Sequence, residues 1–420
     1  MESITQKMEA SLPASISRLL RDISVVANKS GQSLYMVGGS VRDLLLGRQI
    51  IDIDLATEGD GVLLAHELAR SLGGTFKSSS QFGTAKIRLM GLDIDVASSR
   101  REIYNNPGAL PTVMPGDIVD DLNRRDFTIN AMAIYLDHSR YGDLVDFNHG
   151  KRDIEDRVIR VLHDKSFQDD ATRMIRAVRY EQRLGFSINH HTLQHLANDI
   201  HNIHTISKDR LQKEIRRALG EERPARTLAR LSRLGILESV HSPLGKYAKI
   251  ADRVVELENS GLYNNSVLIY LASLACQITL SEGIKLIERL NMPKSWARVV
   301  KDTCQISEST KLHSRVLKNR DLYALLAGLD INAIRAASLL HYNEQAQWNL
   351  SFFLSNLDNI SSMVSAHEIM ALGVPQGPMV GKVMEELRDG ILDGRIYTKK
   401  DAMILIQEFL TRKDSGENRP

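Results

Sequence analysis

Apolar and polar residues recur with two different periods in the first third of the chain. Residues 34–37 form an apolar run typical of a buried strand, a pair of glycines favours a turn, and residues 40–46 repeat at helical spacing. The next strand is predicted around Asp52 and Asp54, because apolar residues alternate with these two acids. Successive side chains of a strand point to opposite faces, so both carboxylates are expected on one face.

Further elements are predicted on both sides of this motif. They are an amphipathic helix over 16–26, a helix over 59–74 and strands over 75–77, 85–90 and 92–97. The segment 98–122 shows no period, and so long an irregular stretch inside a compact domain is usually functional. From about residue 151 onward only helical spacing recurs. We therefore expect an α+β chain, with a mixed sheet and helices in an N-terminal head followed by an all-helical remainder.

Length and composition set further limits. A chain of 420 residues should form more than one domain, and a formal net charge of +2 confines any nucleic-acid surface to a local patch. Cys276 and Cys304 are the only cysteines and are too far apart for a zinc motif. No apolar run approaches the ~20 residues of a membrane span, and the N-terminus has no signal-peptide core. A soluble, cytoplasmic protein that does not contact a membrane is expected.

The acid pair has chemical consequences. Two carboxylates on one face repel each other, and a hard divalent cation relieves that repulsion. The strand over 92–97 repeats the pattern with Asp93 and Asp95, which offers a third carboxylate for a two-metal site. Upstream of Asp52, the glycine pair and the helix start let a phosphate approach free backbone N–H groups, and Arg42 adds positive charge. The combination predicts a triphosphate-binding site beside a metal-binding site.

A second polar pattern occupies residues 124–134. Asp126 can cap a helix whose apolar positions face the core. Arg124 and Arg125 would then lie at the positive end of that helix, which is unfavourable unless an anion is bound. The segment therefore predicts an anion site, and the alternative interpretation is a surface helix with a capping acid.

Residues 169–183 combine acids with a basic stripe. Asp169 and Asp170 stand at a predicted helix start. The arginines that follow at helical spacing are Arg173, Arg176, Arg179 and Arg183. A carboxylate only accepts hydrogen bonds and a guanidinium only donates them, so Asp170 with Arg173 matches the amino donor and ring-nitrogen acceptor of both cytosine and adenine. Uracil and guanine present the opposite pattern and would be rejected. Taken alone, these residues also fit a capped helix with a solvated basic face.

Six strings of the chain resemble the motifs of a known family. These are GGSVRDLLLGRQIIDIDLAT, RRDFTINAMAI, DFNHGKRDIEDRVIRVL, DDATR, SKDRLQKEIRRALGEERPARTLARLSRLGIL and, near the C-terminus, HEIMALGVPQGPMVG. They resemble the class II tRNA nucleotidyltransferase and bacterial poly(A) polymerase family, part of the DNA polymerase beta-like superfamily. In the fifth string, Arg210 and Glu214 stand at i, i+4 and match a Glu–Arg pair of the family. The resemblance implies a polymerase-beta-like nucleotidyltransferase head over 1–150, a helical neck with a base-reading motif over 151–235, a helical body over 236–355 and a helical, tRNA-binding tail over 356–420.

The resemblance also implies an activity, its cofactor and its partners. The activity is template-independent addition of CMP and/or AMP, from CTP and ATP, to the tRNA 3′ end, with two Mg²⁺ ions per site. The catalytic and metal-binding residues would be Asp52, Asp54 and Asp95. The nucleotide-binding residues would be Gly39, Arg42, Arg125, Asp170, Arg173, Arg176 and Arg179, the first three for the triphosphate. The expected partner is the acceptor end and elbow of tRNA, without an obligatory protein partner.

Three alternatives stay open. One is a partial enzyme that adds only A or only CC, because the segment before RRDFTINAMAI reads PGALP where many one-enzyme CCA-adding members have a basic Arg-Arg-Pro segment. Another is a poly(A) polymerase, although AKIRLMGLDIDV lacks the Phe-Arg-Leu and His-Val stretch usual in that branch. The third is a non-enzymatic RNA-binding protein, against which the intact set of Asp52, Asp54 and Asp95 argues.

Overall fold

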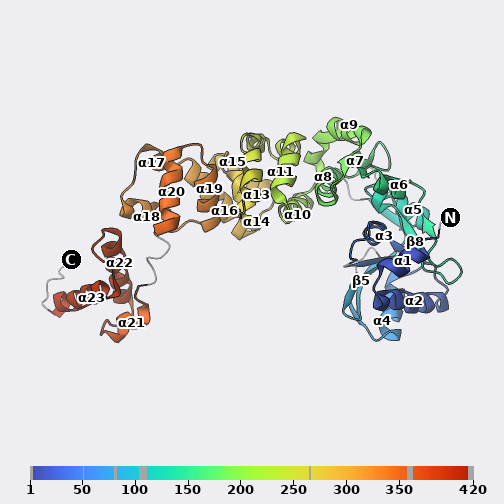
Figure 1. Cartoon of the computed structure of the whole chain (residues 1–420), viewed down its shortest axis with the longest axis horizontal. Helices are drawn as coiled ribbons and strands as arrows, with labels where there is room; N and C mark the ends of the chain where they lie inside the picture. Colours follow the sequence, from blue (N-terminus) through green and yellow to red (C-terminus); the bar gives the residue numbers. More distant parts are fainter. Residues whose placement is uncertain are drawn as a thin grey trace. The chain divides into compact units, whose positions relative to one another are not determined.

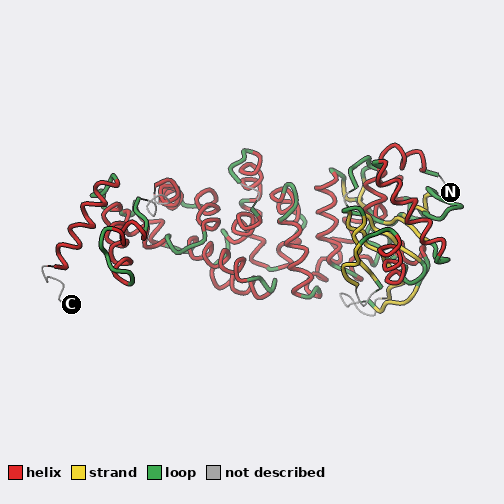
Figure 2. The backbone as a smooth tube through the Cα atoms, turned by 90° about the horizontal axis from the view of Figure 1, so that it is seen from below, coloured by secondary structure: helices red, strands yellow, loops and turns green. Residues whose placement is uncertain are grey.

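The computed structural model describes residues 3–50, 52–79, 83–103, 111–263, 266–356 and 363–414. Backbone contacts divide the chain into two compact units, Met1–Val240 and His241–Pro420. Within the described residues, strands occur in the first unit only, and the second is built of helices (Figure 1, Figure 2). The expected α+β class, with a mixed sheet in the head, is confirmed, and the remainder is mostly helical. It is not all-helical as predicted, because two short strands, Val158–Ile159 and Ser187–Ile188, lie beyond residue 151.

A seven-stranded sheet forms the core of the N-terminal part of the first unit. In spatial order its strands are β3 (Thr75–Ser79), β4 (Thr84–Leu89), β5 (Leu92–Ser98), β2 (Ile53–Thr57), β1 (Leu34–Val37), β8 (Ala133–Tyr135) and β9 (Leu144–Val145). β2 and β5 run parallel, and the other neighbours are antiparallel. Asp54 on β2 pairs directly with Asp95 on β5. The two acidic strands are therefore adjacent, and their carboxylates share one face.

Helices pack around the sheet and then continue the first unit. They are α1 (Thr5–Ser11), α2 (Ala14–Lys29), α3 (Gly39–Leu45), α4 (Gly61–Ser71), α5 (Ile118–Asn123), α6 (Gly150–Glu155), α7 (Ser166–Asp169), α8 (Thr172–Leu184), α9 (His190–Asp199), α10 (Lys208–Leu219), α11 (Pro224–Arg233) and α12 (Ile236–Val240), with 3-10 turns at Thr128–Asn130 and Ile200–Thr205. α4 packs on β4 and β5, and α2 packs on α4 (Figure 1). Ile94 and Val96, which flank Asp95, are fully buried. The acids consequently face away from the side that α4 covers.

The segment 98–122, expected to be irregular, contains defined elements. β6 (Arg100–Ile103) and β7 (Thr112–Pro115) pair antiparallel, and α5 follows. Both strands are exposed or half-exposed along their length, so neither shows the apolar alternation that identifies a strand in sequence. Residues 104–110, which hold most of the PGALP string, lie outside the described residues. A second short pair is parallel, with β10 (Val158–Ile159) beside β11 (Ser187–Ile188).

The prediction of a helix over 124–134 is wrong. Only a 3-10 turn forms, at Thr128–Asn130, and the chain then enters β8, which pairs with β1. Arg124 follows the last residue of α5, so Arg124 and Arg125 lie at a helix end and not at a helix start. The residues of β8 are buried on both faces, and a short apolar run without alternation does not distinguish a strand from a helix. Pairing with β1 decided the outcome.

The second unit is helical wherever it is described. Its helices are α13 (Ala251–Asn259), α14 (Val267–Ala275), α15 (Leu280–Arg289), α16 (Lys294–Ser307), α17 (Thr310–Ser314), α18 (Asn319–Leu326), α19 (Ile331–Leu340), α20 (Glu344–Asn356), α21 (Ala366–Ala371), α22 (Pro378–Leu392) and α23 (Lys399–Asp414), with a 3-10 segment at Ser242–Lys249. One apolar cluster holds α17, α18, α19 and α20 together, and another holds α21, α22 and α23 together. In the described chain no single helix is long and apolar enough to cross a membrane, although the bent pair α18 and α19 passes that test jointly by length and composition.

Candidate active site

Ser40 ties the acidic strand to the helix before it. The Ser40 hydroxyl donates to the carbonyl oxygen of Asp52 (3.1 Å) and accepts from the backbone N–H of Asp54 (2.9 Å). Ser40 is buried in the first turn of α3, whereas Asp52 is exposed just before β2 and Asp54 is half-buried within it. Sequence reasoning missed Ser40, since nothing local indicates a contact across the intervening loop. Its two hydrogen bonds fix the backbone between the two acids.

Arg125 lies directly against the glycine turn. Gly38 has φ +67°, and a Cβ built there would lie 2.4 Å from Nη1 of Arg125. The Arg125 Nη2 donates to Oδ2 of buried Asp121 (2.8 Å), while its Nε is buried and has no hydrogen-bond partner among the described residues. A buried donor without an acceptor is costly. Arg125 therefore has a donor to offer to an acceptor that enters the site.

Replacing Gly38 should disturb this contact. Gly38→Ala strains the backbone by on the order of 1–3 kcal/mol and displaces the Arg125 guanidinium, so we expect a lower melting temperature and a higher KM for the nucleotide. Gly47→Ala is the control, because Gly47 also has a positive φ (+66°) but has nothing within 4 Å of its would-be Cβ. Gly47→Ala should destabilise the protein and leave the KM unchanged. An equal KM in the two variants would contradict the role given to the Gly38–Arg125 contact.

The carboxylates of Asp52, Asp54 and Asp95 lie in each other's electrostatic field. Burial raises the pKa of Asp54, Arg125 partly opposes that rise, and the charges of Asp95 and Asp52 add to it. Oδ1 of Asp95 is buried without a hydrogen-bond partner among the described residues, and Oδ2 pairs with the Lys86 ammonium at 2.8 Å. Lys86 stands opposite Asp95 in the β4–β5 register. Sequence reasoning missed Lys86, because its place depends on that register.

Asp93 is in a different situation from Asp95. It is exposed, with Lys77 2.6 Å and Arg88 3.8 Å from its Oδ1. Its hydrogen bond with Lys77 holds the pKa of Asp93 below its usual range. Lys77 stands on β3 and Arg88 on β4, on the side of β5 away from β2. Asp93 is thus satisfied by surface lysine and arginine, whereas Asp95 keeps a buried oxygen available beside Asp54.

A cavity of about 520 Å³ opens beside the glycine turn. Its lining residues are Gly39, Ser40, Arg42, Asp43, Gln49, Ile50, Asp52, Asp54, Arg176, Arg179, Tyr180, Arg183 and Arg217. Five of these are arginines and three are aspartates, so positive charge is in excess. Arg42 is held rigidly there, because Asp43 binds it at two points (2.9 Å each) and Oδ1 of Asn130 accepts from its Nη1 (2.7 Å). The cavity suits a polyanion next to an acidic pair.

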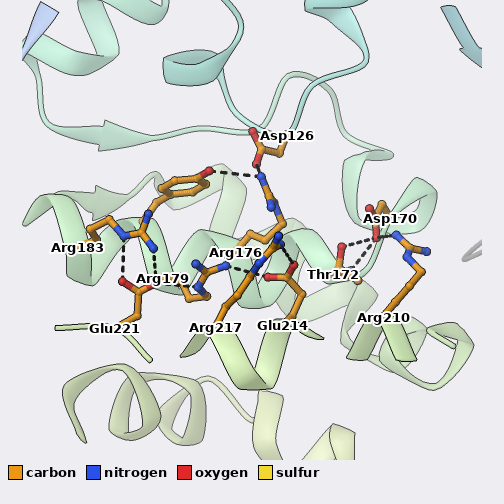
Figure 3. Close-up of polar contacts among 11 residues, drawn as sticks. Asp126, Asp170, Thr172, Arg176, Arg179, Arg183, Arg210, Glu214, Arg217 and Glu221 are labelled. Carbon is orange, nitrogen blue, oxygen red and sulfur yellow. Dashed lines mark hydrogen bonds and ion pairs between the residues drawn. The ribbon is translucent and has the colours of Figure 1, made fainter. Parts of the chain in front are cut away.

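Buried carboxylates hold the arginines of α8 in place (Figure 3). Asp126 binds Arg176, Glu214 binds Arg179 and Arg217, and Glu221 binds Arg179 and Arg183. In Figure 3 Asp126 meets Arg176 from above, whereas Glu214 and Glu221 lie lower in the view with Arg179, Arg183 and Arg217. Sequence reasoning found the arginine stripe but missed Asp126, Glu214 and Glu221 as its partners, because each pair joins residues far apart in the chain.

Asp170 and Arg173 are not among the residues that line the cavity. Arg173 is buried, and its guanidinium donates to Ser166 Oγ (2.6 Å) and to the Arg124 carbonyl oxygen (2.7 Å). Asp170 lies at the start of α8 and pairs with Arg210 of α10 (2.7 Å). Both residues are thus placed at the N-terminal end of the helix whose later turns supply Arg176, Arg179 and Arg183 to the cavity.

Comparisons with known proteins match these features. Residues 34–160 match the family model of the poly A polymerase head domain, and residues 185–245 match that of the probable RNA and SrmB-binding site of polymerase A. An A-adding tRNA nucleotidyltransferase of Geobacter sulfurreducens is 32% identical over 95% of this chain and 48% of its own length. A CC-adding tRNA nucleotidyltransferase of Deinococcus radiodurans is 32% identical over 76% of this chain and 83% of its own length. The chain belongs to the class II tRNA nucleotidyltransferase and bacterial poly(A) polymerase family.

A solved member of this family has the same fold over nearly the whole chain. The Thermotoga maritima CCA-adding enzyme in complex with tRNA superimposes with a TM-score of 0.76 at 25% identity, and the match covers 97% of this chain and 99% of that one. The chain spans about half the length of the Geobacter sulfurreducens relative.

Nucleotidyltransferases of this family generally use a divalent metal, and the residues present fit one by donor chemistry. Asp52, Asp54 and Asp95 supply hard oxygen donors, and the free buried oxygen of Asp95 is such a donor. As they stand, no three His, Cys, Asp or Glu side chains of the described chain are gathered closely enough to hold an ion. The Lys86 ammonium pairs with Oδ2 of Asp95, which leaves Oδ1 as the oxygen that could act as a donor.

Proposed function

We propose that this protein is a template-independent tRNA nucleotidyltransferase that adds CMP and/or AMP, from CTP and ATP, to the 3′ end of tRNA. One observation carries the proposal, namely the cavity that joins Asp52 and Asp54 to five arginines in a chain of this family. A nucleoside triphosphate is a polyanion that reacts beside metal-binding carboxylates.

The acids and the glycine turn have separate roles in the reaction. Asp52, Asp54 and Asp95 would hold two Mg²⁺ ions, which when bound lower the pKa of the attacking hydroxyl and neutralise charge on the departing pyrophosphate. The tRNA 3′-hydroxyl would give its proton to Asp95 as its oxygen forms a bond to the α-phosphorus, the bond from that phosphorus to the β-phosphate oxygen breaks, and pyrophosphate leaves. Gly39 and Arg125 bind the triphosphate, and the rigid Arg42 supplies fixed charge behind it.

Selection of the base is assigned to the start of α8. Asp170 would accept from the exocyclic amino group of cytosine or adenine, and Arg173 would donate to the neighbouring ring nitrogen. Arg176 and Arg179 would support the nucleotide from the following turns, where Asp126, Glu214 and Glu221 hold them. This division leaves the neck over 151–235 as the base-reading part and the head over 1–150 as the catalytic part.

The RNA partner is proposed from the relatives. The Thermotoga maritima enzyme is seen with tRNA, and we propose that the body over 236–355 and the tail over 356–420 bind the same class of molecule along its acceptor end and elbow. Because tRNA is the proposed substrate, we place the protein in the cytoplasm, without an obligatory protein partner.

A second candidate is addition of A alone. The Geobacter sulfurreducens relative, which is matched over 95% of this chain, is an A-adding enzyme, whereas the Deinococcus radiodurans relative adds CC. Both reactions use the same cavity chemistry and differ in the tRNA end that is extended. The choice between them is therefore a question of substrate and not of mechanism.

Three tRNAs test the proposal. They end before the first C, after one C and after both, and each is supplied with CTP or ATP separately and then together. Addition of CMP to the first two and of AMP to the third is the expected result. Extension of the third alone, by ATP, identifies an A-adding enzyme, and extension that stops after CC with ATP present identifies a CC-adding one. Absence of extension on all three tRNAs would contradict the proposed function.

A further inference from the structure

Contacts from two helices hold the carboxylate of Asp170. Its Oδ1 accepts hydrogen bonds from the Thr172 backbone N–H (3.0 Å) and from Thr172 Oγ1 (2.6 Å), and the Arg210 guanidinium lies 2.7 Å from the same oxygen (Figure 3). Thr172 begins α8, whereas Arg210 belongs to α10, which packs against α8. A side chain anchored to two separate elements keeps one orientation.

The contacts make the two oxygens of Asp170 unequal. All three fall on Oδ1, and a carboxylate oxygen has about two lone-pair sites, so Oδ1 has no capacity for another donor. Oδ2 is the oxygen that can accept from an incoming group. Arg173 does not hold the Asp170 carboxylate as Arg210 does, because the Arg173 guanidinium is bound to Ser166 and Arg124.

Arg210 pairs with Asp170, which is not the partner that its position along α10 predicts. A pair with Glu214 would be the usual i, i+4 contact on α10. Glu214 instead binds Arg179 and Arg217, and Arg210 reaches across to the other helix. The charge of Arg210 is thus directed at Asp170 and not at its own helix.

We propose that Arg210 is a positioning residue for nucleotide selection. By pairing with Oδ1 it aims Oδ2 of Asp170 at the exocyclic amino group of an incoming cytosine or adenine. A fixed acceptor penalises a carbonyl oxygen at that position, as in uracil or guanine, whereas an acceptor that can turn away does not. The inference rests on the proposed function, in which Asp170 reads the base.

Kinetic selectivity tests this role. The measured quantity is the ratio of kcat/KM for CTP over UTP, or for ATP over GTP, on the tRNA end that the unmodified protein extends. Arg210→Ala should lower that ratio about tenfold, and Arg210→Lys, which keeps the charge, should restore part of it. Lys213→Ala is the matched control, since Lys213 is exposed one turn further along α10, and it should leave the ratio unchanged. Melting temperatures report whether each variant is folded. If Arg210→Ala does not fold, the kcat/KM ratio of Arg210→Lys tests the role instead.

A double variant separates positioning from a general structural effect. If Arg210 acts through Asp170, then Arg210→Ala lowers the ratio no further in a protein that already carries Asp170→Ala. If Arg210→Ala has the same kcat/KM ratio as Lys213→Ala, and Asp170→Ala lowers that ratio, the positioning role of Arg210 is wrong. The base-reading role of Asp170 would then still hold. An unchanged ratio in Asp170→Ala would instead overturn the base-reading part of the proposed function.

Discussion

Asp54→Asn is expected to abolish nucleotide transfer while the protein stays folded. Asp54 lines the cavity with Asp52 and pairs with Asp95 in the strand register, so its charge belongs to the proposed cation site. The loss should be on the order of 10³-fold or more in kcat, as for other groups that stabilise charge in a transition state. Pyrophosphate release in the presence of tRNA and nucleotide measures it.

The same substitution should not lower stability. Burial raises the pKa of Asp54, and the neighbouring carboxylates add to that rise, so the ionised form is less favourable in the folded chain than in the unfolded chain. Asparagine has the same shape and carries no charge, which leaves the melting temperature equal or higher. Asp93→Asn is the control on the next acidic position, because Asp93 is exposed and paired with Lys77, and it should retain activity. Near-parental transfer by Asp54→Asn would refute the assignment of the acidic pair.

Asp126→Ala is expected to destabilise the first unit strongly. Asp126 Oδ2 accepts from Nε and Nη2 of Arg176, and Oδ1 accepts from Asn130 Nδ2 (2.9 Å) and the Phe127 N–H (2.9 Å). Removing the carboxylate leaves the half-buried Arg176 guanidinium without its counter-ion, and the Phe127 N–H and the Asn130 amide without their acceptor, at a combined cost of about 3 kcal/mol. For a unit of this size the melting temperature should fall by roughly 10 °C, measured by calorimetry or circular dichroism.

A surface acid provides the comparison for Asp126. Asp156 pairs with Arg152 at 3.6 Å, and both side chains are mostly exposed. Such a pair contributes at most about 1 kcal/mol, so Asp156→Ala should leave the melting temperature nearly unchanged. Equal, small effects of the two substitutions would show that the Asp126–Arg176 pair does not support the fold.

The stability that Asp126 contributes should depend on pH. Burial by itself would raise the pKa of Asp126, but the charge of Arg176 and the hydrogen bonds from Asn130 and Arg176 outweigh burial and lower the pKa below its ordinary value. A lowered acid pKa adds stability above the unfolded value of about 4 and loses it as the pH falls through the folded value. The stability gap between the unmodified protein and Asp126→Ala should therefore be full at neutral pH and shrink below about pH 4. A gap that does not change with pH would rule out an ionised Asp126.

Several parts of this protein follow from its sequence. The strand at 34–37, the glycine turn, the helix after it and the acidic strands were all predicted, because each has a local signal in apolar spacing, glycine or alternation. The motif strings pointed to the family that the comparisons then showed. The roles of Asp52, Asp54, Asp95 and the base-reading residues remain predictions.

Tertiary structure decided what no short window of sequence contains. The segment 124–134 has helical spacing, yet pairing with β1 makes its end a strand, since a partner strand satisfies backbone groups that a local pattern cannot assign. The pairs Asp126–Arg176 and Arg179–Glu221 join residues 50 and 42 positions apart, and Lys86 reaches Asp95 only through the β4–β5 register. The sequence alone determined which residue types can bind phosphate and metal. Packing of α8 against α10, and the register of β2, β4 and β5, determined which of them meet, because contacts between distant residues depend on the global fold and not on local spacing.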